Sequence, residues 1–249
     1  KERTTSMKIP ELKGKHVAIV AMGESQIDFH LSRVHSNKYD EVWGINCMGE
    51  ITKCDRVFMM DPVSRFLDTD DAGSQTEIMA TMFKNYKGPI YTCELDDRVP
   101  NAEVFPLQEV VSYADCAYLN NTVPFAFAFA LYQEVDSISI YGIDFSYKGN
   151  LHFAEAGKAC CEFWLAKCIE RGMTVGVGAR SGLLDTNVPI DERIYGYHRL
   201  PDPIIMAVEN GSFKQTTLSQ YNKKLKDENV RKLTQGEIEV PSVLHAPEA

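Results

Sequence analysis

Short, almost wholly apolar runs that stop at a glycine or a polar residue recur along this chain of 249 residues, and they constrain its fold more than any other feature. The clearest are residues 15–22 (KHVAIVAM), which stop at Gly23, and residues 137–141 (SISIY), which stop at Gly142. Continuous apolar runs of this length are typical of strands that are buried on both faces of a parallel sheet. Similar runs predict further strands at residues 39–46, 55–61, 88–93 and 173–177.

The stretches between these runs have helical character, so strands and helices alternate over residues 15–184. We predict helices at residues 63–85, 123–131 and 154–172, and a short strand or extended piece at residues 103–111. This alternation predicts an α/β fold, in which a mostly parallel sheet is flanked by helices in a Rossmann-like arrangement.

The character of the chain changes towards its C-terminal end. Residues 195–203 (YGYHRLPDP) are aromatic and rich in proline, and we expect a flap there or the contact of a homo-oligomer. Residues 205–235 mix lysine with acidic residues, which predicts a polar helix. We therefore expect one Rossmann-like nucleotide-binding domain over residues 7–200, followed by a C-terminal helical extension and a loose tail over residues 201–249.

The composition argues against several classes of protein. A formal net charge of -9 disfavours a broadly basic surface for nucleic acid. No apolar run approaches the roughly 18–20 residues that a membrane span requires. The seven cysteines form no Cys-x-x-Cys pair, and the chain begins without a secretory signal. These features predict free thiols in a reducing cytoplasm and no zinc site, and we expect residues 1–6 to be a processing remnant.

Polar side chains follow one of the two clearest strands, at the place where an α/β sheet binds its ligands. In an open sheet of this class, ligands lie outside the carboxyl ends of the strands. The strand that stops at Gly142 is followed by Asp144, and His152 comes just ahead of a helix. Because a carboxylate and an imidazole suit acid–base chemistry, we predict that Asp144 and His152 are catalytic. A lone histidine in a loop is more often a surface residue, so that remains the alternative for His152.

The turn after the first strand predicts an anion site. It consists of Gly23, Glu24 and Ser25, where the glycine permits a tight turn and the serine can cap the following helix. Backbone N–H groups in such a turn can face a phosphate. The turn has one glycine instead of the Gly-x-Gly-x-x-Gly of a dinucleotide fold, and it lacks the lysine of a P-loop. A plain turn between a strand and a helix therefore remains the alternative.

Two other strand ends and one helix start carry further polar residues. Asn46 ends the second predicted strand, and Asp61 ends the third. An aspartate before a proline is often only a turn residue, so Asp61 has a structural alternative. The apolar helix is preceded by three residues that could hold a nucleotide or simply cap the helix: Asn120, Asn121 and Thr122.

In their order and spacing, these motifs resemble glycosyltransferase family 42, the bacterial sialyltransferase-like proteins. They are also similar to a Rossmann-like group named after 6-hydroxymethylpterin pyrophosphokinase (domain of unknown function 115). The resemblance covers about residues 15–184 and includes Gly-Ile-Asp-Phe at residues 142–145 and Ser-Gly-Leu-Leu at residues 181–184. It implies that His152 is the general base and that Ser181 lies near the donor phosphate. It also implies that the nucleotide is held by Gly23, Ser25, Asn46 and residues 120–122.

The chain departs from this family at three places. Leu119 and Asn120 stand where the family has an arginine ahead of its Ser/Thr cluster. Asp61 stands where the sialyltransferases tend to have asparagine, which favours the pyrophosphokinase-like group or a different sugar. The tyrosines that assist the leaving phosphate in the family have only loose counterparts here, namely Tyr147, Tyr195 and Tyr197.

Three functions are consistent with these residues. The leading one is a metal-independent glycosyltransferase without a bound cofactor, which uses a nucleotide-activated sugar and His152 as general base. Its hydroxyl acceptor would be a glycan, a lipid or a hydroxymethylated base in phage DNA. The second function is pyrophosphoryl or nucleotidyl transfer, in which Asp61 and Asp144 would bind Mg²⁺. The third is a non-enzymatic module that binds a nucleotide without turnover.

Overall fold

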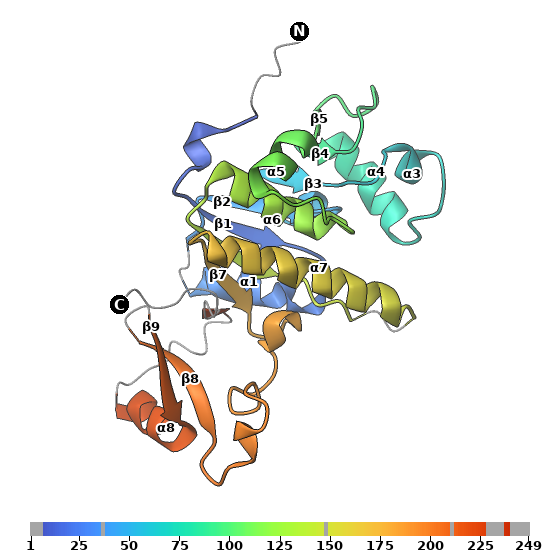
Figure 1. Cartoon of the computed structure of the whole chain (residues 1–249). Helices are drawn as coiled ribbons and strands as arrows, with labels where there is room; N and C mark the ends of the chain where they lie inside the picture. Colours follow the sequence, from blue (N-terminus) through green and yellow to red (C-terminus); the bar gives the residue numbers. More distant parts are fainter. Residues whose placement is uncertain (1–6, 36–37, 147–148, 210–211, 228–236, 240–249) are drawn as a thin grey trace.

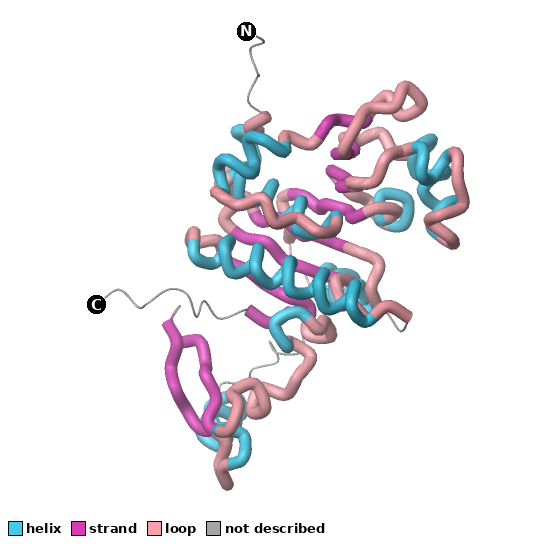
Figure 2. The backbone as a smooth tube through the Cα atoms, turned by 45° about the vertical axis from the view of Figure 1, so that its right-hand side comes forward, coloured by secondary structure: helices cyan, strands magenta, loops and turns pink. Residues whose placement is uncertain are grey.

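A computed structural model describes residues 7–35, 38–146, 149–209, 212–227 and 237–239 (Figures 1 and 2). The predictions made for residues 1–6, for Tyr147 and for the tail beyond residue 239 lie outside the described residues. Of the helices that the structure describes, none combines the length and the apolar character needed to cross a membrane.

Seven parallel strands form the centre of the molecule, which confirms the predicted α/β class. Their order across the sheet is β7-β6-β1-β2-β3-β4-β5, and β10 (Glu237–Glu239) pairs antiparallel with the outer edge of β7. The parallel strands are β1 (His16–Val20), β2 (Glu41–Ile45), β3 (Arg56–Phe58), β4 (Ile90–Thr92), β5 (Ala102–Val104), β6 (Ser137–Tyr141) and β7 (Thr174–Gly178).

Helices cover both faces of this sheet, which is the Rossmann-like arrangement expected from the sequence (Figure 1). One buried cluster joins the sheet to α5 (Leu107–Ala114), α6 (Thr122–Gln133) and α7 (Leu151–Glu170). A second cluster joins the other face to α1 (Ile27–Val34), α2 (Met48–Ile51), α3 (Ser64–Leu67) and α4 (Gln75–Asn85). Short 3-10 helices lie at η1 (Pro10–Leu12), η2 (Glu24–Gln26), η3 (Leu183–Asp185) and η4 (Tyr197–Arg199).

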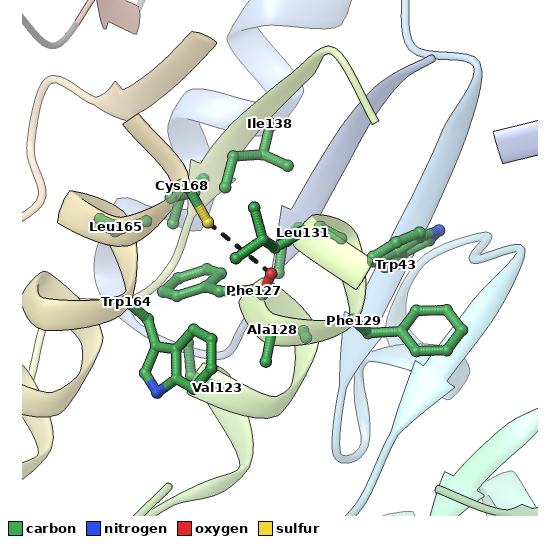
Figure 3. Packing of buried hydrophobic residues seen from close by; sticks show 14 of the residues in the cluster. Trp43, Val123, Phe127, Ala128, Phe129, Leu131, Ile138, Trp164, Leu165 and Cys168 are labelled. Atoms are coloured by element: carbon green, nitrogen blue, oxygen red, sulfur yellow. Dashed lines mark hydrogen bonds between the residues drawn. The ribbon is translucent and has the colours of Figure 1, made fainter. Parts of the chain in front are cut away.

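Helix α6 is the most deeply buried helix of its layer, as its run of phenylalanine and alanine predicts. Ten of its twelve residues are buried, because it packs against the sheet and lies between α5 and α7 (Figure 1). Figure 3 shows Phe127 beside Trp164 of α7, whereas Phe129 points towards Trp43 of β2, with 5.6 Å between the two ring centroids. The small residues between the phenylalanines, such as Ala128, let the helix approach its neighbours closely.

The structure corrects three predicted elements. Residues 103–111 are not one extended piece, because β5 ends at Val104 and α5 begins at Leu107. The helix predicted over residues 63–85 is split into α3 and α4.

The largest correction concerns the C-terminal region. Among the described residues of the polar helix predicted over residues 205–235, only α8 (Leu218–Asp227) is helical. Before it, β8 (Ile204–Glu209) and β9 (Ser212–Thr217) form an antiparallel hairpin that stands apart from the main sheet (Figures 1 and 2). The β-branched residues of these strands, including Ile204, Ile205 and Thr217, favour extended backbone.

Candidate functional site

The order of the strands places a natural binding crevice between β1 and β6. From β1 the chain proceeds through β2, β3 and β4 to β5 at one edge, and it then returns to place β6 on the other side of β1. The loops that follow β1 and β6 therefore leave the sheet in opposite directions. Ligands of open α/β sheets bind at this topological switch point, outside the carboxyl ends of the strands.

A cavity of about 700 Å³ opens at this place. Its volume lies in the range of small-molecule sites, roughly 300–1,000 Å³. The loops after β1, β2, β3 and β6 all contribute to it, together with the first turns of α6 and α7. Eight of the predicted site residues line the cavity: Gly23, Asn46, Asp61, Asn120, Asn121, Thr122, Gly142 and Asp144.

Two glycines allow the loops after β1 and β6 to touch each other. Gly142 has a φ of +69°, and a Cβ atom on it would lie 2.0 Å from the carbonyl oxygen of Ala21. The N–H of Gly23 donates to the carbonyl oxygen of Gly142 at 2.8 Å. A side chain at Gly142 would therefore push the two loops apart and change the floor of the cavity.

Hydrogen bonds between Asp144 and Ser25 stabilise this contact. The N–H of Ser25 donates to Asp144 Oδ2 at 2.8 Å, and its hydroxyl donates to Asp144 Oδ1. The same hydroxyl accepts from the N–H of Gly142 at 2.9 Å, and Ser25 is fully buried. The groups of Gly23 and Ser25 that were predicted to face a phosphate are thus engaged within the protein. Asp144 lines the cavity, but both of its carboxylate oxygens accept hydrogen bonds from Ser25.

Besides Gly142, two non-glycine residues of the cavity wall have left-handed backbone. Asn46 and Phe145 both have a φ of 51°, at the ends of β2 and β6 respectively. This conformation is uncommon for asparagine and strained for a bulky residue such as phenylalanine, and strain of this kind gathers at functional sites. The ring of Phe145 packs against Gly157 of α7, where there is no room for a Cβ atom. Asn46 Oδ1 is buried without a hydrogen-bond partner among the described residues.

The loop after β3 contributes charged residues to the cavity lining. Asp61 Oδ1 accepts from Arg65 Nη1 at 2.5 Å, an ion pair between residues four apart. The backbone carbonyl of Asp61 accepts from the hydroxyl of Thr92 at 3.3 Å. Asp71 adds a further carboxylate to the lining. Arg65 was not predicted from the sequence, because Asp61 lies outside a helix and the four-residue spacing is informative only within one.

The N-terminus of α6 is the best anion site in the cavity wall. Asn121 caps the helix by accepting from the N–H of Val123 at 3.1 Å, and its amide donates to Asn120. Pro124 has no N–H, so the first turn leaves the N–H of Thr122, which donates to no residue that the structure describes. The helix macrodipole adds about half a positive charge at this end.

Four predicted site residues lie outside the cavity lining. Glu24 is exposed in the first turn of η2. Ser181 is buried, and its hydroxyl donates to the carbonyl oxygen of Ile143 at 2.7 Å, so it supports the loop after β6. Ser25 braces the first turn. His152 is exposed in the first turn of α7, next to Phe153, which does line the cavity.

The aromatic side of the cavity was also absent from the sequence analysis. Phe125 of α6, Phe145 after β6 and Phe153 of α7 all line it. Nothing in their spacing along the chain brings these three together, because they come from separate elements. They give the cavity a wall that suits a flat or apolar part of a ligand.

The predicted magnesium ligands are each engaged with another residue. Asp61 pairs with Arg65, and Asp144 accepts from Ser25. Within the described part of the chain, no three histidine, cysteine, aspartate or glutamate side chains gather in a group that could hold a metal ion.

No protein-family model and no curated sequence matches the chain. Similar solved structures include the sialyltransferase CstII from Campylobacter jejuni in complex with cytidine-5'-monophosphate, with 18% identity over 70% of this chain and 84% of that chain and a TM-score of 0.45. The same enzyme in complex with CMP-3FNeuAc has 17% identity over 85% and 98% of the two chains, with a TM-score of 0.44. An apo alpha-2,3-sialyltransferase from Campylobacter jejuni has 15% identity over 89% and 100%, with a TM-score of 0.42. At these TM-scores the likeness decides nothing about activity, so function must be argued from the cavity.

Proposed function

We propose that the protein binds a nucleotide-activated sugar in the cavity and transfers the sugar to a hydroxyl acceptor. The observation that supports this most strongly is the position of the cavity. It lies at the switch point between β1 and β6, and the N-terminus of α6 forms part of its wall. Open α/β sheets bind nucleotides at such points, with phosphate groups at helix N-termini.

Three parts of the cavity wall suit the three parts of such a donor. In this proposal the phosphate lies at the N-terminus of α6, where the N–H of Thr122 can donate to it. The aromatic wall of Phe125, Phe145 and Phe153 offers ring faces to the nucleobase. The wall formed by Asn46 and Asp61 then faces the sugar.

His152 is proposed as the general base that removes the proton of the acceptor hydroxyl. It is exposed in the first turn of α7, beside a residue that lines the cavity. Catalytic groups often reach their hydrogen-bonding distance only in the substrate complex. The N-terminus of α6 would stabilise the charge on the leaving phosphate, so the proposed transfer needs no metal ion. The acceptor class, a glycan, a lipid or a hydroxymethylated DNA base, stays a prediction from the sequence.

A second function is favoured by one observation, because Asp61 and Asp144 line the same cavity. Two carboxylates at strand ends could bind Mg²⁺ for pyrophosphoryl transfer of the pterin pyrophosphokinase type. Both would first have to exchange their present partners, Arg65 and Ser25, for the ion. Dependence of ligand binding on magnesium separates this function from sugar transfer.

The test is a transfer assay with CMP-, UDP-, GDP- and ADP-sugars in EDTA, in which release of the nucleotide is followed by chromatography. We expect one donor class to be consumed by the wild-type protein. His152→Ala should lower kcat by roughly 10²–10⁴-fold, the usual contribution of a general base, with little change in donor affinity. His35→Ala, at the exposed end of α1, is the matched control. Equal rates for His152→Ala and the wild type would exclude His152 as the base, and binding of a donor without turnover would indicate the non-enzymatic module.

A further inference from the structure

We infer that the sugar part of the donor is uncharged, and that the cavity disfavours a sugar that carries a carboxylate. This inference rests on the proposed function and names the substrate class more closely. It rests on two independent properties of the cavity wall. One is the excess of carboxylates over cationic groups, and the other is the presence of acceptor oxygens without a partner.

The cavity is acidic. Three carboxylates line it, those of Asp61, Asp71 and Asp144, against one guanidinium, that of Arg65. The other lining residues that the structure describes are uncharged. A donor already brings at least one negative charge with its phosphate, so the N-terminus of α6 is needed to accommodate that group.

The one guanidinium of the lining is already committed. Arg65 lies 2.5 Å from Asp61, and the two side chains are 42% and 31% exposed. A sugar carboxylate that bound Arg65 would have to displace Asp61 or lie beside it, where the two negative charges repel each other. Like charges at such distances strongly disfavour the second charged form.

The same wall holds two acceptor oxygens that have no partner among the described residues. Asn46 Oδ1 is buried without a partner among the described residues, and Asp61 Oδ2 has no hydrogen bond to any of them. Sugar hydroxyls can donate to both atoms, whereas a carboxylate has no proton to donate. An unpaired buried acceptor is costly, so this wall gains most from a ligand that is rich in hydroxyl groups.

The experiment compares donors that differ at one carbon of the sugar. For whichever nucleoside diphosphate binds, calorimetry gives the dissociation constants of its hexose, the matching uronic acid and the neutral uronamide. UDP-glucose, UDP-glucuronic acid and UDP-glucuronamide are such a set. We expect the hexose to bind at least about tenfold more tightly than the uronic acid. The uronamide has the shape of the carboxylate without its charge, and it should bind within about threefold of the hexose.

Asp61→Asn tests whether this residue sets the selectivity. The substitution keeps the size of the side chain, removes one negative charge and releases Arg65, so the preference for the hexose should fall below about threefold. Asp97→Asn makes the same change of charge at an exposed position outside the cavity lining, and it should keep the full preference.

Two results would overturn the inference while the proposed function stands. One is a uronic acid that binds as tightly as the hexose or more tightly. The other is a uronamide that binds as weakly as the uronic acid, which would show that shape and not charge is selected. If neither the free nucleotides nor any of their sugars bind, the proposed function itself fails, and the inference fails with it.

Discussion

Ser25 illustrates how one small side chain can determine the shape of the site without touching the ligand. It is fully buried, donates twice to Asp144 and accepts from the backbone N–H of Gly142. These bonds join the loop after β1 to the loop after β6, more than a hundred residues later in the chain. The floor of the cavity is therefore a property of the pair of loops and not of either loop alone.

Ser25→Ala should lower the free energy of unfolding by about 1–3 kcal/mol. The substitution removes the hydroxyl and leaves an oxygen of Asp144 and the N–H of Gly142 without their partner. Urea unfolding of the variant measures the change, with Ser212→Ala on the exposed start of β9 as control. A variant as stable as the control would show that the brace contributes nothing to the fold.

Gly142→Ala should destabilise the protein more strongly, by about 2–4 kcal/mol. The new Cβ atom would meet the carbonyl oxygen of Ala21, and a left-handed φ costs an alanine a further 1–2 kcal/mol. Gly149→Ala is the matched control, because a Cβ atom there meets nothing within 4 Å. Thermal unfolding of both variants gives the comparison, and equal melting temperatures would contradict the close approach of the two loops.

At the scale of elements, α6 combines a structural and a functional task. Its body packs against the sheet between α5 and α7, while its first turn forms part of the cavity wall. The cap by Asn121 serves both tasks, since it orders the first turn and leaves the N–H of Thr122 for a ligand. Residues 120–122 were predicted either to cap the helix or to bind a nucleotide, and their placement is compatible with both.

Asn121→Asp should separate the two tasks of α6. Aspartate caps a helix as well as asparagine does, and its charge is favourable at a helix N-terminus, so the unfolding free energy should stay within about 0.5 kcal/mol of the wild type or rise. The same charge would repel a phosphate, so nucleotide affinity should fall at least about tenfold by calorimetry. Gln108→Glu adds a charge to the first turn of α5, away from the cavity, and should leave the affinity unchanged. Unchanged affinity in Asn121→Asp would place the phosphate elsewhere.

The elements that sequence patterns predicted well are those with one strong local signal. The strands of the main sheet are short apolar runs, and α6 is almost wholly apolar. The hairpin of β8 and β9 was missed because it is an isolated ribbon, and most of β9 is exposed or half-buried, so its apolar alternation is weak. Arg65 was missed because its partner lies in a loop rather than on a helix, and the helix predicted there is split.

The same distinction between local and long-range signals holds for the site residues. Residues that end a strand or begin a helix, such as Asn46, Asp61 and Thr122, do line the cavity. Serine is a common ligand-binding residue, but the hydroxyls of Ser25 and Ser181 donate to Asp144 and to the carbonyl oxygen of Ile143. Contacts between segments so distant in the chain leave no trace in local spacing.

At the scale of the whole molecule, the buried thiols predict a loss of stability at high pH. Burial raises the pKa of Cys47 to about 11 and of Cys54 and Cys168 to about 12. In the unfolded chain these thiols ionise near pH 8.5. The pKa values of these thiols are raised in the folded state. Their contribution to the free energy of unfolding is therefore fully present below about pH 8.5, and it is lost as the pH rises towards the folded pKa values.

The free energy of unfolding should therefore fall by about 2 kcal/mol for each of these three thiols between pH 8 and pH 10.5 in a reducing buffer. Urea unfolding at intervals of half a pH unit measures the slope. The slope should be smaller in Cys168→Ala, which removes a fully buried thiol, and unchanged in Cys93→Ser, which alters an exposed one. A flat stability profile up to pH 10.5 would contradict the burial of these thiols.

The central claim is that the cavity at the switch point between β1 and β6 binds the nucleotide of an activated sugar. The most direct test is a thermal-shift titration of the wild type and Asn121→Asp with CMP, UDP, GDP, ADP and ATP, each in EDTA and in magnesium. We expect one nucleotide, in EDTA as in magnesium, to stabilise the wild type by about 2.7 kcal/mol at a hundred times its dissociation constant, and to stabilise the variant far less. A shift with ATP only in magnesium would favour pyrophosphoryl transfer. No shift with any nucleotide, or an equal shift in the variant, would contradict the claim.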